Sequence, residues 1–141
     1  SSPVQVGSAT NWAQISFFLG RDDPERGGWM AVTTDGTLFG TGTQTDAGST
    51  ATGEIGVGNT TTYSVPQQVG SLTDWKNVTC GRMATLAIKT DGTLWTWGRG
   101  YYGLNAQGNN NYYSSPVQVG SDTAWVQIGQ SGKNTKFAMR T

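Results

Sequence analysis

The sequence contains no histidine and only one cysteine, Cys80. Histidine is the commonest general base and the commonest neutral metal ligand, so its absence removes the candidates for serine-type triads and for ordinary zinc sites. A single cysteine cannot form an internal disulfide. With no histidine to activate its thiol, Cys80 is predicted to be a small buried apolar residue. The sequence therefore indicates no enzyme active site, no cofactor and no metal centre.

Charge is also scarce, because charged residues make up only 13% of the chain and the nine basic residues balance the nine acidic ones. A chain without net charge creates no field that would draw it to nucleic acid or to an anionic membrane surface. The sequence also lacks a run of 18 or more apolar residues. We therefore expect no nucleic-acid partner and no membrane insertion.

Glycine is abundant, with 21 residues, and several of these glycines stand in short turn motifs. The stretch Leu86–Gly98, LAIKTDGTLWTWG, predicts a strand, a two-residue Asp91-Gly92 turn and a second strand. The same pattern occurs at Ala31–Phe39, and a further copy begins at Phe137–Thr141. No window sustains the spacing of an amphipathic helix, so the sequence predicts an all-β chain with no substantial helix.

Longer repeats contain these hairpins. The octapeptide SSPVQVGS occurs at Ser1–Ser8 and again at Ser114–Ser121, with the variant SVPQQVGS at Ser64–Ser71. The spacing divides the chain into units 1–63, 64–113 and the partial unit 114–141. Each unit is predicted to hold four short β segments: the Val-Gln-Val run after the proline, a run that begins at a tryptophan (Trp12, Trp75 or Trp125), and the two hairpin arms. Four-stranded units repeating at roughly 40–60 residues are typical of the blades of a β-propeller.

The order SPVQVGS, tryptophan, then TLAIKTDGTLWTWG and a glycine-rich return resembles the RCC1 (regulator of chromosome condensation) repeat, most closely in unit 64–113. Ala84 stands where the family commonly has histidine. The resemblance implies a propeller of which this chain holds about two and a half blades. Because open blades leave strand edges and apolar faces uncovered, we expect the chain to be unstable alone. Its expected partners are further blades of a longer polypeptide or other chains, including copies whose terminal half-unit completes the next sheet.

Two loop insertions distinguish the first unit and are candidate binding loops. The insertion Gly20–Gly28 carries interleaved charges, Asp22, Asp23, Glu25 and Arg26 among them. Its carboxylates suit a hard cation such as calcium, but they lack EF-hand spacing and have arginine neighbours, which favours a solvated loop tip. The insertion around Thr43–Thr52 is rich in threonine, serine and glycine and is predicted to be flexible.

A third candidate loop follows the second hairpin. The segment Gly98–Gly103 fits the pattern G-x-G-x-x-G, but Leu-Asn-Ala-Gln-Gly-Asn follows it instead of a helix, which favours turn glycines over a dinucleotide site. Tyrosine pairs bracket the loop and suit a protein or sugar surface; packing on a neighbouring blade is an equally good interpretation. The candidate residues of this loop are Arg99, Tyr101, Tyr102, Tyr112 and Tyr113.

The functional hypothesis is a non-enzymatic structural or binding module whose blades present loops to other proteins or to glycans. Near-identical repeats, low charge and a surface rich in Ser, Thr, Asn and Gly resemble the bacterial, phage or extracellular branch of RCC1-like repeats. This resemblance favours an extracellular or virion-surface protein. The alternative is guanine-nucleotide exchange on a small GTPase, as the founding family member performs.

Overall fold

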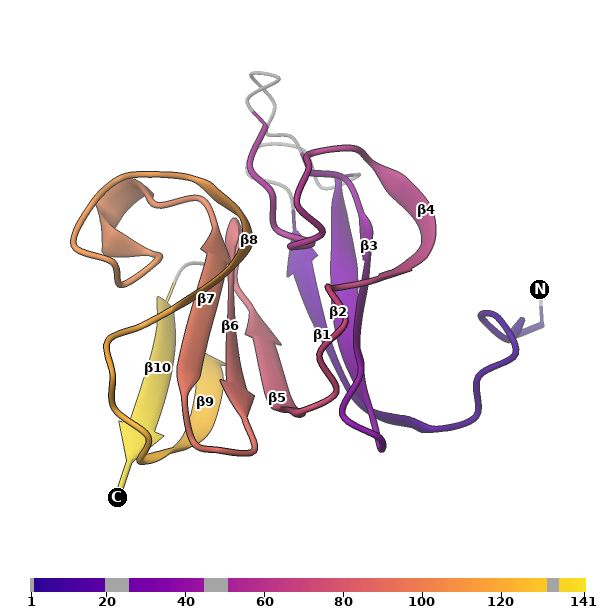
Figure 1. Cartoon of the computed structure of the whole chain (residues 1–141). Coiled ribbons are helices and arrows are strands. Elements are labelled where there is room, and N and C mark those ends of the chain that lie inside the picture. The colour runs from indigo at the N-terminus through magenta and orange to yellow at the C-terminus, as the bar shows by residue number, and fades with distance from the viewer. Residues whose placement is uncertain (1, 20–25, 45–50, 132–134) are drawn as a thin grey trace.

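A computed structural model describes residues 2–19, 26–44, 51–131 and 135–141 of the chain. The described residues form antiparallel β-sheets, which stand side by side in Figure 1. The first sheet holds β1 (Trp12–Leu19), β2 (Gly27–Thr33), β3 (Leu38–Gly42) and β4 (Tyr63–Gln68). The second holds β5 (Trp75–Cys80), β6 (Ala84–Lys89), β7 (Leu94–Gly98) and β8 (Tyr113–Gln118), and the third pairs only β9 (Trp125–Ser131) with β10 (Thr135–Arg140). The predicted all-β fold is confirmed; one short 3-10 turn, η1 (Tyr101–Gly103), is the helical element of the described residues.

Each four-stranded sheet is offset by one strand from the sequence repeat. The outer strands β4 and β8 contain the Pro-Gln-Gln and Pro-Val-Gln runs, which open the following sequence units. Pro66 and Pro116 therefore lie in edge strands, where a residue without a backbone N–H does not interrupt the ladder. A sheet thus takes three strands from one unit and its fourth strand from the next.

The predicted strand at Val4–Val6 is absent. Residues 2–11 carry no strand and lead away from the sheets (Figure 1), with the Val4 side chain 87% exposed. The identical segment in β8 is a strand because β7 pairs with it, through Trp95↔Gln118 and Thr96↔Val117. The third strands of the described sheets, β3 and β7, already pair with β4 and β8, so Val4–Val6 has no strand to join.

The hairpin turns contain three residues, and the two-residue prediction is wrong by one position. The Gly92 N–H donates to the Lys89 carbonyl and the Lys89 N–H to the Thr93 carbonyl, which makes Thr90, Asp91 and Gly92 the loop. Only the glycine is left-handed, with φ +80°. This is a type I turn followed by a left-handed residue. The first hairpin turns in the same way, with Gly36 also at φ +80°.

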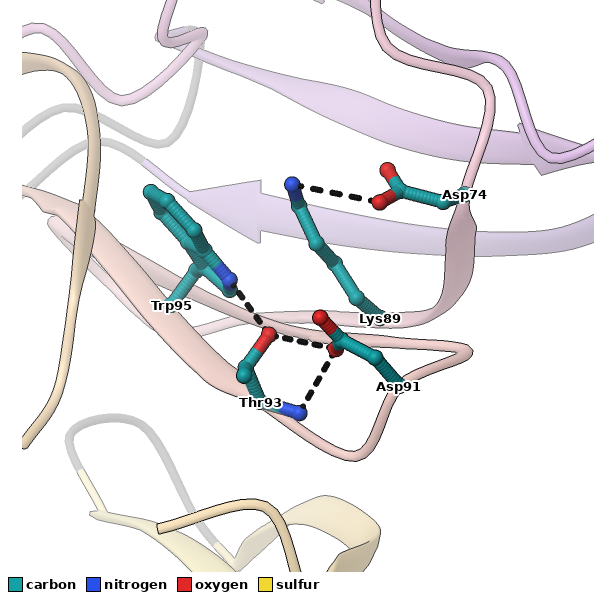
Figure 2. A network of polar contacts seen from close by, with 5 residues as sticks. All are labelled: Asp74, Lys89, Asp91, Thr93 and Trp95. Atoms are coloured by element: carbon teal, nitrogen blue, oxygen red, sulfur yellow. Dashed lines mark hydrogen bonds and ion pairs between the residues drawn. The ribbon is translucent and has the colours of Figure 1, made fainter. Parts of the chain in front are cut away.

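The aspartate of the turn serves as a hydrogen-bond acceptor (Figure 2). Asp91 Oδ1 accepts from the Thr93 hydroxyl at 2.7 Å and from the Thr93 N–H at 3.0 Å. The Thr93 hydroxyl in turn accepts from Trp95 Nε1 at 2.8 Å. The hydrogen bonds from Thr93 lower the pKa of Asp91, because they favour its ionised form.

The core lies between the first and second sheets. Side chains from both sheets and from the connecting loop are buried there, namely Phe18, Met30, Val32 and Leu38 on one side, Trp75, Val78, Cys80, Ala87 and Trp97 on the other, and Ile55 and Val69 between them. Cys80 is fully buried, as predicted, and burial raises the pKa of its thiol to about 12. Because the core residues come from both sheets, the facing surfaces of the two sheets have to be complementary in shape.

Polar contacts between the edge strands β1 and β5 also stabilise this junction. The Gln14 side-chain amide binds the Val78 backbone twice, since Nε2 donates to the Val78 carbonyl at 3.0 Å and Oε1 accepts from the Val78 N–H at 3.0 Å. The Ser16 hydroxyl accepts from the Cys80 N–H at 2.9 Å. These bonds satisfy backbone groups that the ladder with β6 leaves open.

Candidate functional site

The β7–β8 connection, residues 99–112, carries four of the nine predicted loop residues: Arg99, Tyr101, Tyr102 and Tyr112. Arg99 follows Gly98, which ends β7 with φ +93°. The Arg99 guanidinium carbon lies 4.6 Å from the Tyr101 ring centroid and 5.7 Å from that of Tyr112, and Nη1 is 3.0 Å from the Met83 sulfur. The two tyrosine rings meet edge to face at 5.8 Å. A buried guanidinium therefore holds Tyr101 and Tyr112 in one cluster through cation–π contacts.

Tyr102 differs from its neighbours in both backbone and exposure. Its φ is +58°, in the left-handed region that costs a non-glycine residue roughly 1–2 kcal/mol. Its side chain is 94% exposed, so burial within this chain does not offset that cost. A strained backbone that presents an aromatic ring to solvent is a feature from which a function can be hypothesised.

Tyr113 has a packing role. Its ring packs against the core cluster, and its hydroxyl accepts from Asn109 Nδ2 at 3.1 Å. The first return loop repeats this pair, with Asn59 Nδ2 donating to the Tyr63 hydroxyl at 3.0 Å. The two interpretations of the tyrosines therefore apply to different residues, since Tyr113 packs and Tyr102 faces solvent.

The other sequence candidates contribute less. Asp22, Asp23 and Glu25 lie outside the described residues, and Arg26 is half-buried directly before β2. Within the described ranges, no three acidic or cysteine side chains gather as potential metal ligands. The G-x-G-x-x-G segment ends in η1, a single 3-10 turn, and no α-helix follows it among the described residues. Among the residues that the structure describes, no helix is long and apolar enough to cross a membrane.

Comparison with known proteins agrees with the repeat pattern. Residues 75–104 match the family model described as "Regulator of chromosome condensation (RCC1) repeat". The ultraviolet-B receptor UVR8 of Arabidopsis thaliana is 39% identical over 82 residues, which are 55% of this chain and 17% of the receptor. Residues 75–104 are therefore similar to an RCC1 repeat.

Solved structures share the fold. Human WBSCR16 superposes with a TM-score of 0.62 at 21% identity over 83% of this chain. Prp20p of Saccharomyces cerevisiae, described with its binding to Gsp1p and histones, gives 0.67 at 15% identity over 98% of this chain. The chain spans 28% and 31% of those two chains, so it corresponds to part of an RCC1-like propeller.

The matched RCC1 repeat places Tyr101 and Tyr102 at the start of the glycine-rich return. Ala106, later in the same return, has φ +51°, whereas the first return has Gly56 there, with φ +83°. Gly56 packs against the Trp97 indole, and a Cβ at this position would lie 2.7 Å from the indole nitrogen. Ala106, in contrast, is exposed. The second return is thus the more exposed of the two loops.

Two lysines, the buried Lys89 and the half-buried Lys136, were not identified from the sequence. Lys89 Nζ lies 3.4 Å from Asp74 Oδ2 and over the rings of Trp75 and Trp95, at 5.0 and 4.5 Å from their centroids (Figure 2). Lys136 Nζ donates to the Ala84 carbonyl at 2.6 Å, and burial lowers the pKa of this lysine to about 8. Both ammonium groups have partners: Lys89 pairs within its own repeat unit, and Lys136 joins the third sheet to the second.

Proposed function

We propose that this chain is part of a non-enzymatic RCC1-type propeller that binds proteins or glycans through residues 99–112. The supporting observation is Tyr102, which is 94% exposed on a left-handed backbone beside the Arg99 cluster. Because Arg99 fixes the neighbouring tyrosines, the backbone that carries Tyr102 has ordered neighbours, and binding has to order little besides the Tyr102 side chain itself.

The chemistry of this loop favours uncharged ligands. Exposed asparagines, Asn109, Asn110 and Asn111, follow the aromatic cluster and offer both hydrogen-bond donors and acceptors. Flat aromatic rings beside amides suit the hydroxyl groups of a neutral glycan and the polar rim of a protein surface. With low charge and near-identical repeats, the chain fits a bacterial or phage surface protein, at the virion or outside the cell.

The test is binding to an array of neutral glycans and to a displayed peptide library, with Tyr102→Ala and wild type compared. The expected result is a ligand whose affinity falls at least tenfold in Tyr102→Ala. Tyr63→Phe, which removes only the hydroxyl that Asn59 contacts in the first return, is the matched control and is expected to bind as wild type does. A ligand bound equally well by Tyr102→Ala, or no ligand from either collection, would reject the proposal.

The alternative proposal is guanine-nucleotide exchange on a small GTPase. Its support is the fold shared with Prp20p, whose described binding to Gsp1p belongs to that protein. The measurement is release of a fluorescent guanine nucleotide from a Gsp1p-type GTPase in the presence of this chain. A release rate equal to the spontaneous rate would reject exchange activity and leave the loop proposal in place.

A further inference from the structure

A cavity of about 230 Å³ lies between the first and second sheets. Its walls come from residues 56–58 of the first return, from the β4–β5 connection, and from Trp75, Trp95 and the edge of β8. Both sheets that enclose it have four strands. A further sheet would stack beyond the first or the third sheet, so it would not fill this space. We call it the Trp75 cavity.

Trp75 has a buried hydrogen-bond donor that its neighbours do not satisfy. The indole N–H of Trp97 donates to the Glu54 carbonyl at 2.7 Å, and that of Trp95 donates to the Thr93 hydroxyl at 2.8 Å. Trp75 is 2% exposed and lines the cavity, but its Nε1 has no acceptor among the described residues. Because buried polar groups in native structures are nearly always paired, the cavity is where we look for the missing acceptor.

The same arrangement recurs at the next junction. Trp125 is the equivalent tryptophan of the third sheet, and its buried Nε1 also lacks an acceptor among the described residues. It lines a cavity with Val119, as Trp75 does with Val69. The unpaired indole N–H is therefore a feature of the repeat. Since the third sheet has two described strands, the inference is confined to the Trp75 cavity.

The lining favours an uncharged ligand. No residue that lines the cavity is charged, and the ammonium group over the two tryptophan rings, that of Lys89, is paired with Asp74 at 3.4 Å (Figure 2). The polar side-chain groups of the lining are the Trp75 N–H and the Ser115 hydroxyl. A buried water typically makes about three hydrogen bonds, so these two side chains hold it poorly. An apolar ligand that carries one acceptor suits the lining better.

The volume and the aromatic walls indicate the class of ligand. An apolar cavity of about 150 Å³ holds benzene, so this one has room for a single ring with a short substituent. Trp75 and Trp95 meet edge to face at 6.0 Å, and a third ring would extend this packing. Leu72 is the one large apolar residue of the lining that is exposed, so the rim lacks the roughly 800 Å² that a stable protein partner covers.

We propose that the Trp75 cavity binds a small, uncharged aromatic compound whose carbonyl oxygen accepts a hydrogen bond from Trp75 Nε1. The ring packs against Trp95 and the apolar residues of the first return and the β4–β5 connection. The carbonyl satisfies the one indole N–H of this junction that the chain itself leaves unpaired.

The test follows the indole N–H signals of the whole chain in nitrogen-15 correlation spectra. The chain has six tryptophans, and the Trp75 signal is identified by its loss in Trp75→Phe. The probes are acetophenone and α-methylstyrene, which have nearly the same shape but differ in a C=O and a C=CH₂ group. Acetophenone is expected to move the Trp75 signal downfield and to saturate it. α-Methylstyrene is expected to bind about tenfold more weakly, the equivalent of one hydrogen bond.

Two variants locate the binding. Val57→Phe fills the cavity from the first return, and Ser115→Phe covers it from an exposed position of β8. In each, acetophenone should no longer move the Trp75 signal. Val65→Phe, at the equivalent exposed position of β4 and outside the cavity, is the control and should bind as wild type does. Far-UV circular dichroism verifies folding, and Ser115→Phe alone serves if the more buried Val57→Phe does not fold.

Three results would overturn the inference. A Trp75 signal that acetophenone leaves unmoved up to its solubility limit would show that the cavity admits no such ring. Equal affinities for the two probes would exclude the hydrogen bond from Nε1. A shift that persists in folded Ser115→Phe and Val57→Phe would place the ring elsewhere. The outcome is independent of the ligand of residues 99–112, because that loop contributes nothing to the Trp75 cavity.

Discussion

Replacing Gln14 by leucine removes the polar contact between the first two sheets while keeping a side chain of similar size. Val78 is 0% exposed, so water cannot readily replace the lost partners of its N–H and carbonyl groups. An unsatisfied buried backbone group costs about 1–3 kcal/mol. Because Gln14 itself is exposed and partial rehydration from its side is available, we expect a loss of about 2 kcal/mol in the free energy of unfolding.

The assay is urea unfolding, followed by tryptophan fluorescence and by far-UV circular dichroism. Gln67→Leu is the matched control, because its amide bonds only nearby carbonyls of its own strand, those of Val65 and Pro66. It should change the free energy of unfolding by less than about 0.5 kcal/mol. If Gln14→Leu proves as stable as this control, the hydrogen bonds to Val78 do not stabilise the junction.

Three further changes test the packing and the buried charge. Ile55→Ala should lower the free energy of unfolding in urea by about 2–5 kcal/mol, because Ile55 is 0% exposed between the two sheets. A loss below about 1 kcal/mol would mean that Ile55 does not contribute to the packing of the two sheets. Gly92→Ala should destabilise more than Gly70→Ala, since both have positive φ but only at Gly92 would a Cβ fall 1.9 Å from the Thr123 carbonyl; equal losses would contradict that approach. Between pH 8 and 9 the free energy of unfolding should rise by about 1 kcal/mol, because the pKa of Lys136 falls from 10.5 to about 8 on folding and the unfolded chain then binds more protons. Above pH 9 the rise should level off, since the pKa of Cys80 rises from 9.0 to about 12 on folding and the folded chain keeps a proton that the unfolded chain loses. A rise that persists in Lys136→Met, measured by urea unfolding at each pH, would exclude this cause.

The elements that local sequence determines were predicted correctly. The strands of the second hairpin follow from alternating apolar and β-branched residues around Asp91-Gly92, and the observed β6 and β7 cover the predicted arms. The turn was wrong by one residue, because the hydrogen bonds that Asp91 accepts favour a type I turn in which only the glycine is left-handed. The prediction of a strand at Val4–Val6 was wrong for a different reason, because this segment forms a strand only where a neighbouring strand pairs with it, as β7 pairs with β8.

The candidate site could be predicted only in part. The tyrosines of residues 99–112 were identified from composition. Which of them pack in the cluster and which face solvent depends on the position of Arg99, and no sequence pattern specifies that position. Lys89 and Lys136 were missed because their partners come from distant segments, Asp74 in one case and the Ala84 carbonyl in the other.

The one-strand offset between repeat and sheet determines where such a protein can be divided. Cutting before Ser64, where the sequence motif begins, would remove β4 from the first sheet and leave the edge of β3 exposed. A cut in the connection 69–74 leaves both neighbouring sheets whole. Modules for transplantation, circular permutation or shortened variants should therefore be taken from one such connection to the next, across the visible boundaries of the motif.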